Sequence, residues 1–86
     1  MDIRLTQHAE AKITLRALDR EQVIRVAREP EQIVYPPDLP PVAQSRIRER
    51  GKLYLYRVPF RDQGDTRVVI TVYKTSQVKR YWQETP

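Results

Sequence analysis

The chain of 86 residues has room for one small domain, and residues 1–86 are expected to form it. It contains no cysteine and a single histidine, which excludes a disulfide framework and a thiolate metal site and argues against structural zinc, so no metal or other cofactor is expected. Sixteen Lys and Arg against eleven Asp and Glu give a net charge of +5, and twelve of the sixteen are Arg. Because a guanidinium matches phosphate oxygens and stacks on bases, this surplus favours a nucleic acid partner; a solvated basic surface or an acidic protein partner is the alternative.

Membrane and secretory classes are not indicated. No apolar stretch approaches the roughly 18 residues that a membrane span needs, so no membrane partner is expected. The first seven residues lack the apolar core of a signal peptide. The cytoplasm is therefore the default expectation for the location of the protein.

Two helices are predicted at the start of the chain. Thr6 is a suitable N-cap, and neither Gly nor Pro interrupts the stretch that follows, so a first helix is expected over about residues 7–17. Asp19 begins a capping box, and Pro30 disfavours helical geometry in the residue before it, so a second helix is expected over about residues 20–28. The short gap between the two helices predicts a tight helical pair.

A proline-rich connection follows. Residues 36–41 contain four prolines, which exclude both a helix and a central strand there. The preceding residues 33–35 fit either a short strand or an extended segment. The connection is too short to link two separate cores, which again indicates one domain.

Beyond the prolines the pattern is that of an antiparallel sheet. Residues 42–48 alternate weakly, residues 52–60 alternate well, and residues 67–73 are almost continuously apolar and are placed centrally. Turns are expected at Gly51 and over residues 61–66. The predicted fold class is α+β, with two N-terminal helices packed on one face of a three- to four-stranded antiparallel sheet and the other face partly exposed.

The first candidate site lies on the first predicted helix. His8, Lys12 and Arg16 are spaced by four and fall on one helical face, beside an apolar line that borders the sheet. The functional interpretation is a contact to phosphate or to an RNA backbone, with His8 as proton donor or acceptor. The alternative is a solvated helix edge.

The second candidate site is on the strands. Arg46, Arg48, Arg57 and Arg67, together with Tyr54 and Tyr56, resemble a stacking platform with backbone clamps, because alternate strand residues share a face. The alternative is the ordinary outer face of a half-exposed sheet.

The third candidate site follows the last strand. Lys74, Lys79, Arg80 and Tyr81 place cations beside an aromatic ring, a combination that can hold a base together with its phosphate. The alternative is a C-terminal cover in which Tyr81 and Trp82 pack over the sheet while the cations are solvated.

The sequence also limits the available chemistry. It shows no Gly-rich phosphate loop, no nucleophilic triad and no carboxylate cluster suited to Mg²⁺. Cleavage of RNA by this chain would therefore be metal-free and would use the 2′-OH of the RNA as nucleophile. The protein would supply cations for the phosphate and a group that moves a proton.

Three segments carry a resemblance to a known family: "TQHAEAKITLRALDREQVIRVAREPEQIV", "AQSRIRERGKLYLYRV" and "VVITVYKTSQVKRYW". Together they resemble an uncharacterised bacterial domain family placed with the RelE/ParE-like toxin superfamily. The resemblance implies a toxin-like fold of two helices on an antiparallel sheet. Members of the superfamily include ribosome-dependent mRNA interferases and gyrase inhibitors that an antitoxin neutralises. The resemblance aligns the family's histidine and basic residues with His8, Lys12 and Arg16, and a position after the last strand with Lys74.

These observations lead to one principal hypothesis and its alternatives. The principal hypothesis is a toxin-like RNA-interacting domain, including the form in which it is a metal-free endoribonuclease of a toxin–antitoxin pair. The candidate catalytic residues at the scissile region are His8, Lys12, Arg16 and Lys74, and Arg57, Lys74 and Tyr81 would serve as phosphate clamp and stacking partner. The partners would be RNA or the ribosome and an acidic antitoxin-like protein. The alternatives are a non-catalytic binding module, a homodimer formed through a sheet edge, and a degenerate toxin fold with a structural role.

Overall fold

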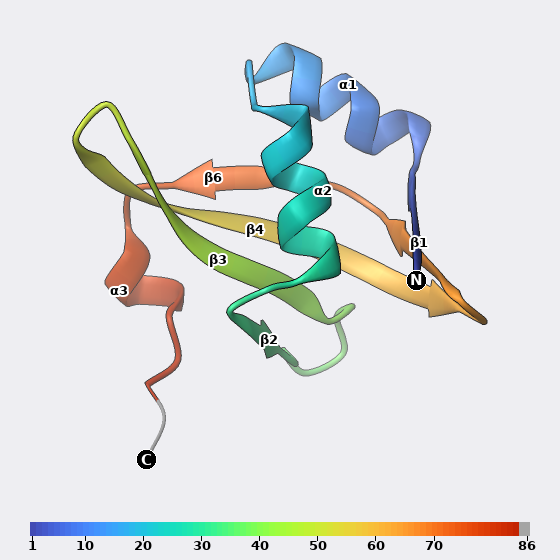
Figure 1. Ribbon diagram of the computed structural model, residues 1–86. Helices are drawn as coiled ribbons and strands as arrows, with labels where there is room; N and C mark the ends of the chain where they lie inside the picture. Colours follow the sequence, from blue (N-terminus) through green and yellow to red (C-terminus); the bar gives the residue numbers. More distant parts are fainter. Residues whose placement is uncertain (85–86) are drawn as a thin grey trace.

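Six strands and three short helices make up the computed structural model, which describes residues 1–84 (Figure 1). In chain order they are β1 (Asp2–Leu5), α1 (Gln7–Leu15), α2 (Arg20–Arg28), β2 (Gln32–Val34), β3 (Val42–Glu49), β4 (Lys52–Gln63), β5 (Thr66–Val69), β6 (Tyr73–Thr75) and α3 (Val78–Tyr81). None of the helices within residues 1–84 combines the length and the apolar character that crossing a membrane requires.

The strands form one mixed sheet in the order β1-β5-β4-β3-β2, with β6 also paired to β4. β1 runs parallel to β5, and every other pairing is antiparallel. The predicted fold class is therefore wrong, because the sheet has six strands instead of three or four, one pairing is parallel, and a third helix follows the sheet. The domain is a small one of mixed helix and strand.

The elements that sequence analysis missed, β1 and α3, are short. β1 has four residues and α3 is a single turn of four residues, so neither is long enough to show a hydrophobic period. β1 is held instead by its partner, with Ile3 opposite Arg67 and Leu5 opposite Val69. The second helix, by contrast, was predicted over residues 20–28 and is confirmed with those bounds.

The segment predicted as one strand over residues 67–73 is divided into β5 and β6. Both pair with the same side of β4, and Pro59 of β4 lies opposite the interruption. The Pro59 carbonyl accepts a hydrogen bond from the Ile70 amide (2.9 Å), but proline has no N–H to donate in return. The Ile70 carbonyl instead accepts from the Thr6 hydroxyl (3.0 Å), which joins the start of α1 to the interruption.

Helix α1 ends earlier than predicted because the chain turns into a left-handed conformation at Ala17 (φ 51°). The Leu18 amide donates to the Ile13 carbonyl (2.9 Å) and the Ala17 amide to the Thr14 carbonyl (3.2 Å), which is the Schellman pattern. Leu18 and Ile13 are both buried in the core, as this motif favours. The turn directs the chain at once into α2.

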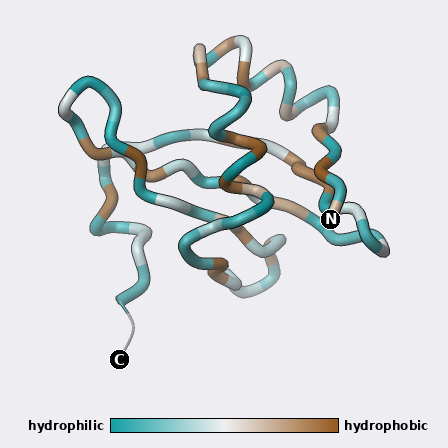
Figure 2. Tube along the Cα trace, viewed as in Figure 1, coloured by the Kyte–Doolittle hydropathy of each residue, from teal (hydrophilic) through white to brown (hydrophobic). Residues whose placement is uncertain are grey.

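The two faces of the sheet are covered differently. α1 and α2 pack on one face, where side chains of both helices and of β3 to β5 form the core. The core includes Ala9, Ile13, Val23, Val26, Ala27, Ala43, Tyr56, Val58, Phe60 and Val69. Figure 2 shows the corresponding hydrophobic residues on α2 and on the strands behind it, whereas the β3–β4 hairpin tip is hydrophilic. The C-terminal segment with α3 lies over the other face, where Gln44 and Arg57 contact Tyr81.

Candidate functional site: a cationic cleft beside helix α1

A cleft of about 820 Å³ opens where the α1–α2 connection, the β3–β4 hairpin and β6 meet. These three segments lie at one end of the sheet, with the hairpin and the α1–α2 connection on either side of β6 (Figure 1). The lining residues are Arg16, Ala17, Leu18, Asp19, Glu49, Arg50, Lys52, Tyr54 and Lys74. We call this set the cationic cleft, because four cations and two carboxylates line it.

Lys74 is placed in the cleft by its pairing opposite Tyr56, which puts both side chains on the helix-facing side of the sheet. Its ammonium lies 2.7 Å from a Glu49 carboxylate oxygen, and the buried Tyr56 hydroxyl donates to the other Glu49 oxygen (2.7 Å). The hydrogen bond from Lys74 lowers the pKa of the Glu49 carboxyl most, and the hydrogen bond from Tyr56 lowers it further. Glu49 is therefore ionised at neutral pH, and it fixes the position of the Lys74 ammonium.

The ring of Tyr54 forms part of the cleft wall beside two ammonium groups. The Lys74 Nζ atom lies 4.5 Å from the ring centroid and the Lys52 Nζ atom lies 5.6 Å from it. Tyr54 is half-buried, so part of the side chain remains accessible. An aromatic ring flanked by cations can stack a base while the cations meet a phosphate.

Arg16, at the C-terminal end of α1, is held by a hydrogen bond to the segment between β5 and β6. Its guanidinium donates to the Val72 carbonyl (3.0 Å), and a single such bond leaves its other N–H groups available. Asp19, on the same side of the cleft, is the N-cap of α2 and accepts from the amides of Glu21 and Gln22. The Asp19 carboxylate is thus directed to the helix N-terminus, which offsets part of its charge.

The hairpin tip places a further cation at the cleft. Arg50 and Gly51 have φ values of 53° and 79°, so both central residues of the two-residue turn are left-handed, as in a type I′ turn. Glycine adopts this conformation readily, whereas a side chain such as that of Arg50 makes it unfavourable by about 1 kcal/mol. Arg50 therefore occupies a position for which its residue type is a poor local choice.

Only part of the predicted helix stripe reaches the cleft. Arg16 lines it together with Lys74, and Tyr54 of the predicted platform joins these two residues there. His8 is exposed in the first turn of α1, about 12 Å along the helix from Arg16, and Lys12 lies between them. Neither His8 nor Lys12 is among the lining residues.

The predicted arginine–tyrosine platform is divided between the two faces of the sheet. Strand alternation puts Tyr54 and Tyr56 on the helix-facing side, and Tyr56 is fully buried. Arg46, Arg48 and Arg57 lie on the opposite face, because they pair with Leu55, Leu53 and Gln44 there.

Each of these three arginines has a partner within the chain. Arg57 donates to Gln44 and to the Tyr73 hydroxyl, and its guanidinium lies 4.3 Å from the Tyr81 ring centroid. Arg46 forms a bidentate pair with Glu31, and Arg48 donates to the Gly51 carbonyl. The predicted clamp of Arg57 and Tyr81 is thus an internal contact that attaches the C-terminal segment to the sheet.

Arg67 is a core residue. It is 8% exposed and donates twice to Asp62 (2.8 and 3.1 Å) and once to the Ala27 carbonyl of α2 (3.0 Å). Its guanidinium also lies 4.0 Å from the Phe60 ring centroid. With these contacts made and α2 above it, Arg67 has a structural role, and it does not line the cationic cleft.

Lys79 and Arg80 are exposed on α3, on the face of the sheet away from the cationic cleft. Arg80 donates to the Gln77 side chain (3.2 Å). Across residues 1–84, no group of three His, Asp or Glu side chains is arranged to hold a metal ion.

Three members of the cleft were not predicted as site residues, namely Glu49, Arg50 and Lys52, whereas Tyr54 was predicted as part of the stacking platform. A signal for them existed. Every second residue of β4 lies on the same face, so Tyr54 and Lys52 share the face of Tyr56. Glu49 shares it too, because it pairs with Lys52 across the two-residue turn. Glu49 and Arg50 were interpreted only as part of a turn and Lys52 only as the start of a strand, and the spacing gives no indication that the α1–α2 connection lies opposite.

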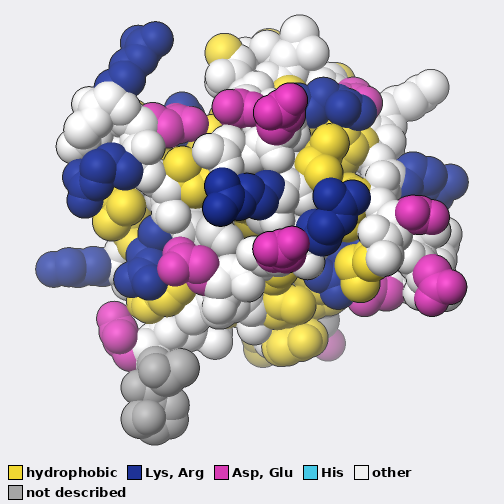
Figure 3. All heavy atoms as spheres, viewed as in Figure 1, with side chains coloured by type: hydrophobic (Ala, Val, Ile, Leu, Met, Phe, Trp, Pro, Cys, Tyr) yellow, Lys and Arg dark blue, Asp and Glu magenta, His cyan; other side chains and the backbone are white. Residues whose placement is uncertain are grey.

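The space-filling view shows basic and acidic side chains interspersed over the face that carries α1 and α2 (Figure 3). A broad patch of one sign does not cover this face, so the local arrangement of cations matters more than the net charge. The chain matches no protein-family model, no curated protein and no solved structure.

Proposed function

We propose that the cationic cleft binds the sugar–phosphate backbone of single-stranded RNA. The observation that carries this proposal is the convergence of Arg16, Arg50, Lys52 and Lys74 on one concave surface that also contains the Tyr54 ring. Cations alone would suit any anion. A ring beside them adds a surface for a base, which single strands expose and duplexes do not.

RNA is preferred over DNA because of the resemblance to a domain family placed with the RelE/ParE toxin superfamily, which includes mRNA interferases. In this proposal the protein acts in the cytoplasm, where RNA is accessible. The family resemblance supports the partner class, whereas the contacts of the cleft support the place of binding.

The contacts favour binding over cleavage of the RNA. The Glu49 carboxylate is the nearest candidate for a proton acceptor, but both its oxygens already accept hydrogen bonds and its pKa is lowered. A general base with a low pKa is a weak one at neutral pH. His8, the proton-transfer group suggested by the sequence, is not among the residues lining the cleft. We therefore propose a non-catalytic RNA-binding domain.

The test is fluorescence anisotropy of a labelled single-stranded RNA at several salt concentrations. Neutralisation of three or four phosphates gives a slope of log affinity against log salt of about −2 to −3. Lys74→Met and Lys52→Met should each weaken binding about tenfold at low salt and should each reduce the slope by about 0.7. Arg4→Met is the matched control, because Arg4 is exposed on β1 at the other edge of the sheet.

Two outcomes would contradict the proposal. Equal losses for the cleft variants and Arg4→Met would show that binding follows total charge and does not involve the cleft. Tighter binding of a DNA strand of the same sequence would argue against RNA as the partner. The RNA recovered after incubation should be intact on a denaturing gel, and fragments that Glu49→Gln abolishes would establish cleavage instead.

A further inference from the structure

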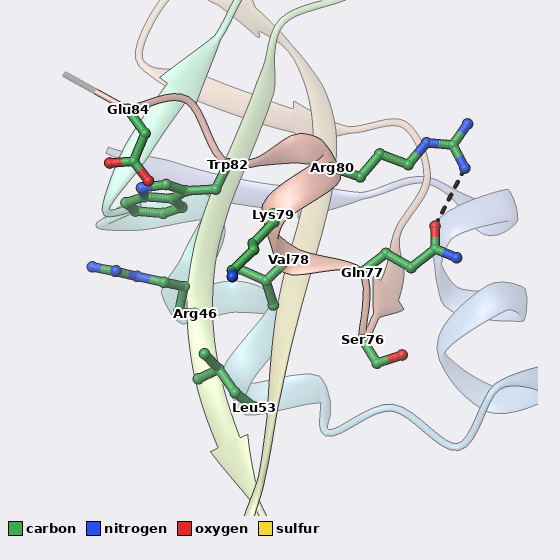
Figure 4. Close-up of a pocket in the computed structure, with 9 residues that line it drawn as sticks. All are labelled: Arg46, Leu53, Ser76, Gln77, Val78, Lys79, Arg80, Trp82 and Glu84. Atoms are coloured by element: carbon green, nitrogen blue, oxygen red, sulfur yellow. Dashed lines mark hydrogen bonds between the residues drawn. The ribbon is translucent and has the colours of Figure 1, made fainter. Parts of the chain in front are cut away.

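A second concave surface lies on the face of the sheet away from α1 and α2. It is a groove of about 850 Å³ between the β3–β4 hairpin and the C-terminal segment (Figure 4). Its lining residues are Arg46, Leu53, Ser76, Gln77, Val78, Lys79, Arg80, Trp82 and Glu84. We call it the C-terminal groove.

The apolar part of the groove consists of Leu53, Val78 and Trp82. Leu53 is exposed at the hairpin end of β4, and the other two side chains are half-buried. Figure 4 shows the three at the groove, with the Arg46 side chain next to the Trp82 ring. Exposed apolar side chains gathered in a concavity commonly mark a site for an apolar ligand or partner.

The rim of the groove is basic. Lys79 and Arg80 are exposed, and among the residues described, 1–84, neither is in a salt bridge. Arg46 is already paired with Glu31, and Glu84 contributes one carboxylate. The charge that is left uncompensated at the rim is therefore positive, which favours an acidic partner.

The groove suits aliphatic side chains better than a nucleobase. The Arg46 guanidinium lies 3.9 Å from the Trp82 ring centroid, so one face of the one aromatic ring in the lining already has an internal partner. The remaining apolar side chains, Leu53 and Val78, are aliphatic and offer no ring for stacking. An extended or helical peptide with leucine-like anchors fits this lining.

The groove is held in place by internal contacts of the C-terminal segment. The Gln44 side chain donates to the Tyr81 carbonyl (3.1 Å), and the Gln32 side chain both donates to the Gln83 carbonyl (2.9 Å) and accepts from the Gln83 amide (3.0 Å). The Arg57–Tyr81 contact adds to these. A partner would meet a groove that is already formed, so little ordering would be needed on binding.

We propose that the C-terminal groove is the docking site for an acidic, leucine-containing peptide segment of a partner protein. A second copy of this chain is a poor occupant, because two molecules of charge +5 repel each other. The proposal does not depend on RNA binding, since the groove and the cationic cleft lie on different faces and share none of their lining residues.

The chain provides its own reporter for this site. Trp82 is the only tryptophan and it lines the groove, so its emission responds to occupation of the groove itself. The probe is a short synthetic peptide of leucines, glutamates and serines without aromatic residues. We expect a saturable shift of Trp82 emission with this peptide. A peptide with lysines in place of the glutamates should bind at least about tenfold more weakly.

Variants distinguish peptide binding in the groove from a general effect of the charge of the protein. Leu53→Ser and Lys79→Glu should each weaken peptide binding about tenfold, while Leu39→Ser, at an exposed position in the proline-rich connection, should leave it unchanged. Lys74→Met, which alters the cationic cleft, should also leave it unchanged.

Three results would overturn the proposal. They are the absence of a saturable emission change, equal binding of the acidic and basic peptides, and a concentration-dependent emission change without peptide, which would indicate a second copy. A shift of Trp82 emission produced by single-stranded RNA and abolished by Leu53→Ser would assign the groove to RNA instead.

Discussion

Two cation–carboxylate pairs lie on the helix-facing side of the sheet, one at each end, and they have different roles. Arg67 and Asp62 are 2.8 Å apart beneath α2, while Lys74 and Glu49 are 2.7 Å apart in the cationic cleft. The Arg67 side chain is 9% exposed and the Lys74 side chain 29% exposed. The pairs are similar in chemistry, but α2 closes over the Arg67 guanidinium, whose partner Asp62 is 47% exposed, whereas the Lys74 ammonium remains accessible.

The difference shows that a basic residue on this sheet becomes structural or functional according to what packs above it. α2 supplies the Ala27 carbonyl to Arg67, so that guanidinium has internal partners on two elements. Above Lys74 the chain passes through the α1–α2 connection, which contributes Arg16 to the cleft and leaves space between them. Three predictions test this contrast.

The largest effect on stability is expected at the Arg67–Asp62 pair. Arg67→Met keeps the aliphatic stem but leaves Asp62 and the Ala27 carbonyl without their donor, which should lower the free energy of unfolding by about 2 kcal/mol. For a domain of this size the melting temperature should fall by about 8–16 °C. RNA affinity, measured well below that temperature, should not change.

Arg61→Met is the control for this change, because Arg61 is exposed on the same strand as Asp62. Thermal unfolding followed by circular dichroism should place this variant within about 0.5 kcal/mol of wild type. A loss of RNA affinity in Arg67→Met without a loss of stability would contradict a purely structural role for Arg67.

An intermediate effect on stability is expected at the Lys74–Glu49 pair, and this effect depends on pH. The pKa of the Glu49 carboxyl lies below its usual value in the folded protein because of Lys74 and then Tyr56. Glu49 therefore stabilises the fold at pH above about 4.5, and this contribution disappears as the pH falls through the lowered pKa. Glu49→Gln should cost about 1 kcal/mol at pH 7 and close to nothing near pH 2.

Urea unfolding of wild type and Glu49→Gln at several pH values measures this difference directly. Leu39→Ser, at an exposed position of the proline-rich connection, removes no titratable group, so it serves as the comparison and should give the same difference at every pH. A cost of Glu49→Gln that is independent of pH would contradict a lowered pKa of Glu49 in the folded protein.

The smallest effect on stability is expected at two left-handed residues that both line the cleft, Ala17 and Arg50. Ala17→Gly and Arg50→Gly should each raise stability by about 0.5 kcal/mol, because glycine relieves the positive φ but makes the unfolded chain more flexible. Only Arg50→Gly removes a cation, so only that variant should bind RNA more weakly. Equal RNA affinity of the two variants would remove Arg50 from the proposed site.

The sequence by itself determined the local features that depend on neighbouring residues. The caps at Thr6 and Asp19, the bounds of α2 and the two-residue turn at Gly51 were predictable, because each follows from residues a few positions apart. The alternation of β4, with Tyr54 and Tyr56 on the face opposite to Arg57, was also readable from the pattern of period two.

Only the tertiary structure decided which of the cations share a surface. The β5–β6 interruption at Pro59, the burial of Arg67 beneath α2 and the meeting of Arg16 with Lys74 all involve residues far apart in the chain. Their arrangement depends on strand order and helix packing, which a single sequence does not encode as a local period. For that reason the basic composition indicated an anionic partner, whereas the fold selected the few cations that are placed to meet one.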